Sequence, residues 1–116
     1  VPDLTSLEYA ASLGFDYIVY HEQWPGLYGS PVPTDKQSAL TLRTFRDAIN
    51  KLGMKMMIYV GFGLNREIPE AKLYLDHWRR DPPHTGGPAK GPLSYAVTCK
   101  NVSSYTDYML EGIAST

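Results

Sequence analysis

Side chains that can do chemistry gather in residues 16–35, which read DYIVYHEQWPGLYGSPVPTD. His21 supplies a base, and Glu22 supplies a carboxylate that can serve as acid, base or nucleophile. Trp24 and Tyr28 follow in a stretch rich in Pro and Gly, and their rings have flat apolar faces with a polar edge. Such rings suit the C–H faces of a sugar.

Structural roles are the alternative for these four residues. If a strand continues through His21 and Glu22, the two side chains point to opposite faces and one of them alone meets a pocket. A hydrogen-bonded His21–Glu22 pair that ties the loop down fits the same pattern. For Trp24 and Tyr28, packing of the loop competes with stacking on a sugar.

Two similar helix–glycine–strand units must position these residues. Helices are predicted over residues 4–13 and 36–52, with Asp3 and Asp35 as N-caps and Gly14 and Gly53 after their ends. Strands are predicted over 15–20 and 54–63, which are short and rich in β-branched and apolar residues. The predicted apolar stripes of the helices are Leu4, Leu7, Ala10 and Ala11, and then Leu40, Leu42, Phe45, Ala48, Ile49 and Leu52.

The two units also align as a repeat with a spacing of 39 residues. Placing Gly14 on Gly53 sets EYAASLGFDYIVY over DAINKLGMKMMIY and aligns Tyr20 with Tyr59. A repeated helix–strand unit predicts parallel strands joined by helical crossovers.

A third unit is predicted from weaker patterns. Pro69 to Trp78 is expected to be helical, residues 81–92 to form an irregular loop, and residues 93–99 to form a third strand. Ser103 or Ser104 is expected to cap a last helix. That helix would turn Tyr105, Tyr108, Met109 and Ile113 towards the core.

The loops predict where a site would lie. Connections from helix to strand are short, whereas the first two strands are followed by long loops, about 21–34 and 61–68. In (β/α)8 barrels the loops at the carboxyl ends of the strands build the site, and a complete barrel takes roughly 250 residues. The 116 residues therefore predict a single α/β domain over 1–116. It would be part of such a barrel, with about three parallel strands, four helices and open sheet edges.

Several segments together resemble glycoside hydrolases with a (β/α)8 barrel, similar to melibiase-like α-galactosidases. These segments are SLGFDYIVYHEQW, GLYGSPVPTD, AINKLGMKMMIYVGFGL and VTCKNVSSYTDYMLEGI. In that group a strand ending in His-Glu-x-Trp precedes a capped helix and a Gly-Met-Lys strand. The resemblance covers nearly the whole chain, although the remaining strands of the barrel are missing.

The resemblance and the strand ends together predict the site residues. Glu22 and His21 are the expected catalytic pair. Hydrolysis of a glycoside usually needs two carboxyl groups, roughly 5–10 Å apart. Glu22 is the only carboxylate at a predicted strand end, so we expect no turnover by this chain alone. The expected substrate-binding residues are Trp24, Tyr28, Tyr59, Arg66 and Lys100.

The sequence thus predicts a carbohydrate-active, glycoside hydrolase-like barrel fragment. Two alternatives stay open. One is a non-catalytic sugar-binding or self-associating α/β module. The other is an orphan fragment without a function of its own.

The composition of the chain limits which classes of partner and cofactor are expected. A formal charge of −1, with acids and bases mixed along the chain, argues against a nucleic-acid binder. No apolar run approaches the roughly 20 residues of a membrane span, and residues 1–10 lack the pattern of a signal peptide. No set of His and Cys has metal-like spacing, so neither a metal nor another cofactor is expected. Open sheet edges predict a homo-oligomer or a missing barrel remainder. The compartment stays open, secretion of a parent protein included.

Overall fold

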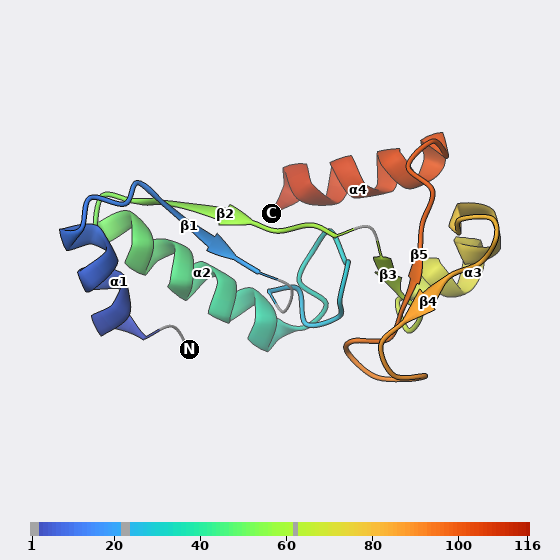
Figure 1. Cartoon of the computed structure of the whole chain (residues 1–116), viewed down its shortest axis with the longest axis horizontal. Coiled ribbons are helices and arrows are strands. Elements are labelled where there is room, and N and C mark those ends of the chain that lie inside the picture. The colour runs from blue at the N-terminus through green and yellow to red at the C-terminus, as the bar shows by residue number, and fades with distance from the viewer. Residues whose placement is uncertain (1–2, 22–23, 62) are drawn as a thin grey trace.

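The chain is elongated and has two lobes, as the computed structural model shows in Figure 1. The structure describes residues 3–21, 24–61 and 63–116. Its extents are 46 × 26 × 23 Å, and its radius of gyration of 15.7 Å exceeds the roughly 13 Å of a compact domain of this length. The first lobe holds α1 (Leu4–Ser12), β1 (Tyr17–Tyr20), α2 (Lys36–Lys51) and β2 (Lys55–Ile58).

Local signals set the bounds of the first two helices as predicted. The Asp3 carboxylate accepts from the Thr5 amide, and the Asp35 carboxylate accepts from the Ser38 amide at 2.8 Å. Gly14 and Gly53 have φ of +83° and +78°, which a side chain would strain. The predicted N-caps and terminal glycines are therefore confirmed.

The first lobe is a β–α–β unit with parallel strands, as the repeat predicted. β1 pairs with β2 from Tyr17 opposite Lys55 to Tyr20 opposite Ile58. Paired residues are thus 38 positions apart, one fewer than the 39-residue repeat. A shift of one residue along a strand places a side chain on the opposite face of the sheet. Tyr20 and Tyr59 accordingly lie on opposite faces, although the repeat aligns them.

One face of this sheet is packed and the other is open. Ile18 and Met56 pack on the buried cluster of Leu7, Ile49 and Met54, and Tyr20 meets Phe45 of α2 edge-on at 4.8 Å. Leu4 and Leu40, predicted in the apolar stripes, are instead exposed. The opposite face carries four apolar side chains that no helix covers in the described part of the chain. We call it the open sheet face, and its residues are Tyr17, Val19, Met57 and Tyr59.

The second lobe corrects the predicted third strand. β5 (Tyr95–Val97) does not join the parallel pair, because it is antiparallel to β3 (Gly63–Asn65) and β4 (Thr85–Gly86) in a separate sheet. The chain forms β3 soon after β2, within the predicted loop, and β4 lies within the predicted irregular loop. The fold is therefore a mixed α/β arrangement in which no barrel is closed. The lobe also contains α3 (Pro69–Trp78), as predicted, and α4 (Ser103–Ser115).

The start of α4 differs from the prediction. Val102 is the N-cap, Ser103 is the first helical residue, and no side chain caps the helix. The Ser104 hydroxyl instead accepts a hydrogen bond from Trp78 Nε1 at 3.0 Å. Further along α4, Ile113 is exposed rather than in the core.

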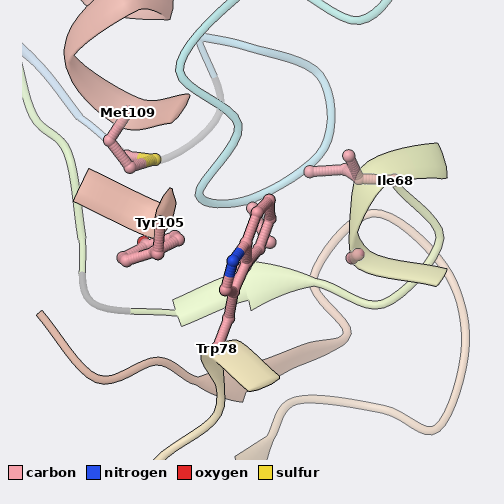
Figure 2. Close-up of a cluster of buried hydrophobic side chains, with 6 residues drawn as sticks. Ile68, Trp78, Tyr105 and Met109 are labelled. Atoms are coloured by element: carbon pink, nitrogen blue, oxygen red, sulfur yellow. The ribbon is translucent and has the colours of Figure 1, made fainter. Parts of the chain in front are cut away.

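Trp78 organises the core of the second lobe. Figure 2 shows its ring between Ile68 and Tyr105, with Met109 nearby, and the Trp78 and Tyr105 ring centroids are 5.5 Å apart. Tyr105 and Met109 are buried, as the periodicity of the last helix predicted. The remaining buried members of this cluster are Leu64 and Ala71.

The loop between β1 and α2 connects the two lobes. The Tyr28 amide donates to Pro92 O, and the Asn65 amide donates to Tyr28 O, both at 2.9 Å. A side chain on Gly112 of α4 would collide with the Pro31 ring. This loop therefore fixes α4 and the antiparallel sheet against the first lobe.

Candidate functional site

His21 and Tyr59 meet where β1 and β2 end. The Tyr59 amide donates to Tyr20 O at 3.0 Å, so the parallel pairing continues past the strands and sets residue 59 beside residue 21. The two rings stack with centroids 4.1 Å apart and planes at 20°. Tyr59 is 36% exposed and His21 is exposed as well. The pair, which we call the ring pair, forms a partly exposed stack of two aromatic rings at the carboxyl end of the sheet.

Trp24 supports the ring pair by donating hydrogen bonds to the backbone carbonyls of Tyr59 and His21. Its Nε1 donates to Tyr59 O at 2.7 Å, and its amide donates to His21 O at 3.4 Å. The Trp24 side chain is only 2% exposed, so its ring has no free face for a sugar in this structure. Sugar stacking by Trp24 stays a prediction, whereas its contacts give it a packing role.

Tyr28 lies close to Tyr59 across a glycine. A Cβ on Gly61 would collide with the Tyr28 hydroxyl and lie 3.4 Å from the Tyr59 ring. Tyr28 is half-buried and tilts against Tyr95, with ring centroids 4.9 Å apart. Position 61 therefore leaves little room for a side chain, and the glycine there lets Tyr28 and Tyr59, two of the predicted binding residues, approach each other.

A cavity of about 330 Å³ begins directly after β2 and contains Lys100. Val60 and Gly61 line it on one side, and α4 lines it on the other with Tyr105 and Met109 among its residues. Lys100 is exposed, and its carbonyl accepts from the Thr106 hydroxyl at 2.9 Å. Lys100 and the residues that follow β2 thus line one cavity, although Lys100 follows β5 of the antiparallel sheet and not a third parallel strand.

Arg66 lies apart from this group and has structural partners. Its Nε donates to the Ser94 hydroxyl at 2.9 Å, and its Nη2 donates to Pro88 O at 3.3 Å. The adjacent Asn65 is fully buried and donates from Nδ2 to Gly91 O and Pro92 O at 2.9 and 2.8 Å.

Sequence reasoning missed Asn65 as the residue that orders this segment. Its Oδ1 accepts from the Glu67 amide at 2.7 Å, in the manner of an Asx-turn just before Pro69 begins α3. The spacing of Asn65 and Pro69 was the signal available in the sequence.

Glu22, the predicted catalytic carboxylate, lies outside the described residues. Within the parts of the chain that the structure describes, no three His, Cys, Asp or Glu side chains are grouped as a metal site. The described portion of the site therefore consists of aromatic rings, a cation and backbone groups.

Two other carboxylates line a cavity elsewhere, of about 530 Å³, beside α3 and α4. They are Glu70 and Glu111, and Tyr108 lies with them. Burial, and then the negative charge of Glu70, raise the pKa of Tyr108 to about 12, while a hydrogen bond with Ser30 acts in the opposite direction. At neutral pH this tyrosine is therefore a hydrogen-bonding group rather than a base.

Comparison with known proteins gives no match to a family model, to a curated protein or to a solved structure. The resemblance to glycoside hydrolases therefore stays an inference from the motifs. Across the residues that the structure describes, no helix is both long and apolar enough to cross a membrane.

Proposed function

We propose that this chain is part of a glycoside hydrolase-like (β/α) barrel that binds a carbohydrate at the carboxyl ends of β1 and β2. The stacked His21 and Tyr59 rings carry the proposal, since they place an exposed aromatic surface where parallel strands end. In barrels this end of the sheet holds the ligand. Lys100, in the neighbouring cavity, supplies donors for a sugar hydroxyl.

Binding without hydrolysis is the form of activity that the site supports. The ring pair and Lys100 include no carboxylate, whereas cleavage of a glycosidic bond usually needs two carboxyl groups. Glu22 follows His21 in sequence and would be one of them. The second would have to come from strands that this chain lacks, so we expect affinity without turnover.

Calorimetric titration with mono- and oligosaccharides, α-galactosides included, tests the proposal. We expect weak binding, with a Kd of about 1 mM, because one aromatic stack contributes only about 0.5–1.5 kcal/mol beyond its buried area. Tyr59→Ala should weaken binding about tenfold, which corresponds to about 1.4 kcal/mol. Tyr74→Ala is the matched control, because Tyr74 is a similarly exposed tyrosine on α3 in the other lobe.

Two outcomes would remove the proposal. One is the absence of binding across the panel, which would favour the orphan fragment. The other is equal affinity of wild type and Tyr59→Ala, which would place any sugar elsewhere on the molecule.

Self-association is the second candidate, and the open sheet face favours it. Tyr17, Val19 and Met57 are each more than half exposed, at 54%, 55% and 51%. Tyr and Met are enriched and charged residues are depleted at the cores of protein interfaces. Pairing two such faces would bury roughly 800 Å² in total, given about 150–250 Å² for a large aromatic side chain. Stable interfaces bury about 1,200–2,000 Å², so we expect a weak dimer.

Light scattering after size exclusion at rising protein concentration tests this candidate. Met57→Glu should keep the chain monomeric, because it places a charge at the centre of the face. Leu73→Glu on α3 is the control, as Leu73 is exposed at 71% and lies in the other lobe. A wild-type chain that stays monomeric at high concentration would exclude this dimer.

A further inference from the structure

The outer edge of β2 is an unpaired strand edge beside a cavity. Within the described residues β2 pairs with β1 alone, in a two-stranded sheet. The amides of Lys55 and Tyr59 donate to β1, so the backbone groups of Met56 and Ile58 point to the outer edge. Met56 and Ile58 also line a cavity of about 590 Å³, which lies between this edge, α2, residues 32–33 and the end of α4 at Ile113, Ser115 and Thr116. We call this cavity the edge cleft.

The edge cleft has an apolar floor and a cationic rim. Leu42 of α2 is buried at its base, next to Met56 and Ile58. The charged residues that line it are Arg43, Arg46 and Lys55, and the described lining residues include no carboxylate side chain.

Most of the positive charge on the rim is not neutralised by neighbouring carboxylates in the described part of the chain. Arg46 is partly neutralised by Asp47, at 2.9 Å on the exposed surface. Arg43 and Lys55 have no carboxylate partner among the residues that the structure describes. A ligand that enters the edge cleft therefore meets positive charge and unpaired backbone groups together.

We propose that the edge cleft, at the edge where a complete barrel would add its next strand, binds an extended acidic peptide segment of a partner protein by strand addition to β2. Main-chain hydrogen bonds to Met56 and Ile58 would supply affinity, and alternate apolar side chains would enter the cleft. Acidic side chains of the segment would meet the rim. A second copy of this chain fits less well, because edge-to-edge pairing of two β2 strands would bring both cationic rims together.

Peptide binding can be measured by fluorescence anisotropy with two labelled eight-residue peptides. One alternates Val and Glu, and the other alternates Val and Lys. We expect the Glu peptide to bind at least about tenfold more tightly and to weaken as salt is raised, because the contacts are exposed. Equal binding of both peptides, or of neither, would overturn the proposal.

Variants on α2 test the location. Arg43→Glu combined with Arg46→Glu should abolish the preference for the Glu peptide, and circular dichroism would confirm that the fold is retained. Arg80→Glu combined with Lys90→Glu makes the same change in net charge in the other lobe and should have no effect. A control pair that weakens binding as much as the α2 pair would show attraction to net charge alone and would overturn the site.

The peptide itself tests strand addition without altering the protein. N-methylation of every Val and N-methylation of every Glu remove opposite sets of backbone donors, and a strand uses only one set toward its neighbour. One methylated peptide should therefore bind like the parent and the other should bind at least about tenfold more weakly. Equal affinities would rule out strand pairing. A dimer that the Arg43→Glu and Arg46→Glu pair dissociates would identify a second copy as the occupant instead.

Discussion

At the scale of single residues, the site depends on how one buried ring holds two exposed ones. Trp24 donates from Nε1 to Tyr59 O and from its backbone amide to His21 O, so the indole and the backbone of this one residue together tie the two strand ends. Trp24, one of the residues predicted to bind a sugar, thus supports the ring pair instead. Burial, which the sequence could not show, separates these two roles.

Trp24→Phe should lower the free energy of unfolding by about 1–3 kcal/mol. The part-buried Tyr59 carbonyl would lose its donor at 2.7 Å, and the smaller ring would leave space where the buried indole packs; together these losses cost about that much. Urea unfolding followed by circular dichroism measures the change. A loss below about 0.5 kcal/mol would mean that this hydrogen bond does not fix the loop.

Tyr108 should make the protein less stable at alkaline pH. Burial and the charge of Glu70 raise its pKa from 10.0 to about 12, so the folded state keeps the proton that the unfolded state loses. Its contribution is present in full below pH 10 and is lost as the pH rises to about 12. Urea unfolding at several pH values should show a shallower decline for Tyr108→Phe than for wild type. Equal declines would contradict the assignment to Tyr108.

At the scale of elements, local signals predicted the helices well. The caps of α1 and α2, the glycines that follow these two helices and the bounds of α3 lie where the sequence placed them, because each depends on neighbouring residues. The register of β1 on β2 did not follow from the repeat, since pairing is decided across 38 residues. Nor did the direction of β5, whose neighbours β3 and β4 lie in segments predicted as loops.

Two apolar positions of α2 show that helical periodicity alone does not decide which residues of a predicted apolar stripe are buried. Leu40 and Ile49 belong to the same predicted stripe, yet Leu40 is 59% exposed and Ile49 is fully buried. Ile49→Ala should lower the free energy of unfolding by about 2–5 kcal/mol, whereas Leu40→Ala should change it by less than about 0.5 kcal/mol. Comparable losses of stability at the two positions would mean that Leu40 is buried as well, and would contradict this packing of α2.

At the scale of the whole molecule, the sequence predicted the class of fold but not its extent. A β–α–β unit with an open face and an unpaired edge is what part of a barrel would contain. The second lobe, however, is an antiparallel sheet with its own core around Trp78. The ring pair could be anticipated from strand ends, while Asn65 and the two-lobed shape depend on contacts between distant segments.

Substitution of Gly112 tests whether the contact between α4 and the loop at Pro31 joins the two lobes. In most helices Gly→Ala is stabilising, by up to about 1 kcal/mol. Here the added Cβ would collide with Pro31, so Gly112→Ala should instead destabilise the protein by about 1–3 kcal/mol through overpacking. Glu111→Ala, one position earlier and exposed, is the control in urea unfolding. A stabilising Gly112→Ala would show that α4 does not rest on this loop.

The central claim is that a sugar lies on the stacked His21 and Tyr59 rings, and aromatic NMR spectra test it most directly. During titration with a saccharide that binds in calorimetry, the ring signals of His21 and Tyr59 should shift together and saturate at the same concentration. The ring signals of Tyr74 and of Tyr9, an exposed tyrosine on α1, should stay in place. Saturating shifts confined to residues outside the ring pair, or no shift of the Tyr59 signals at saturation, would contradict the account.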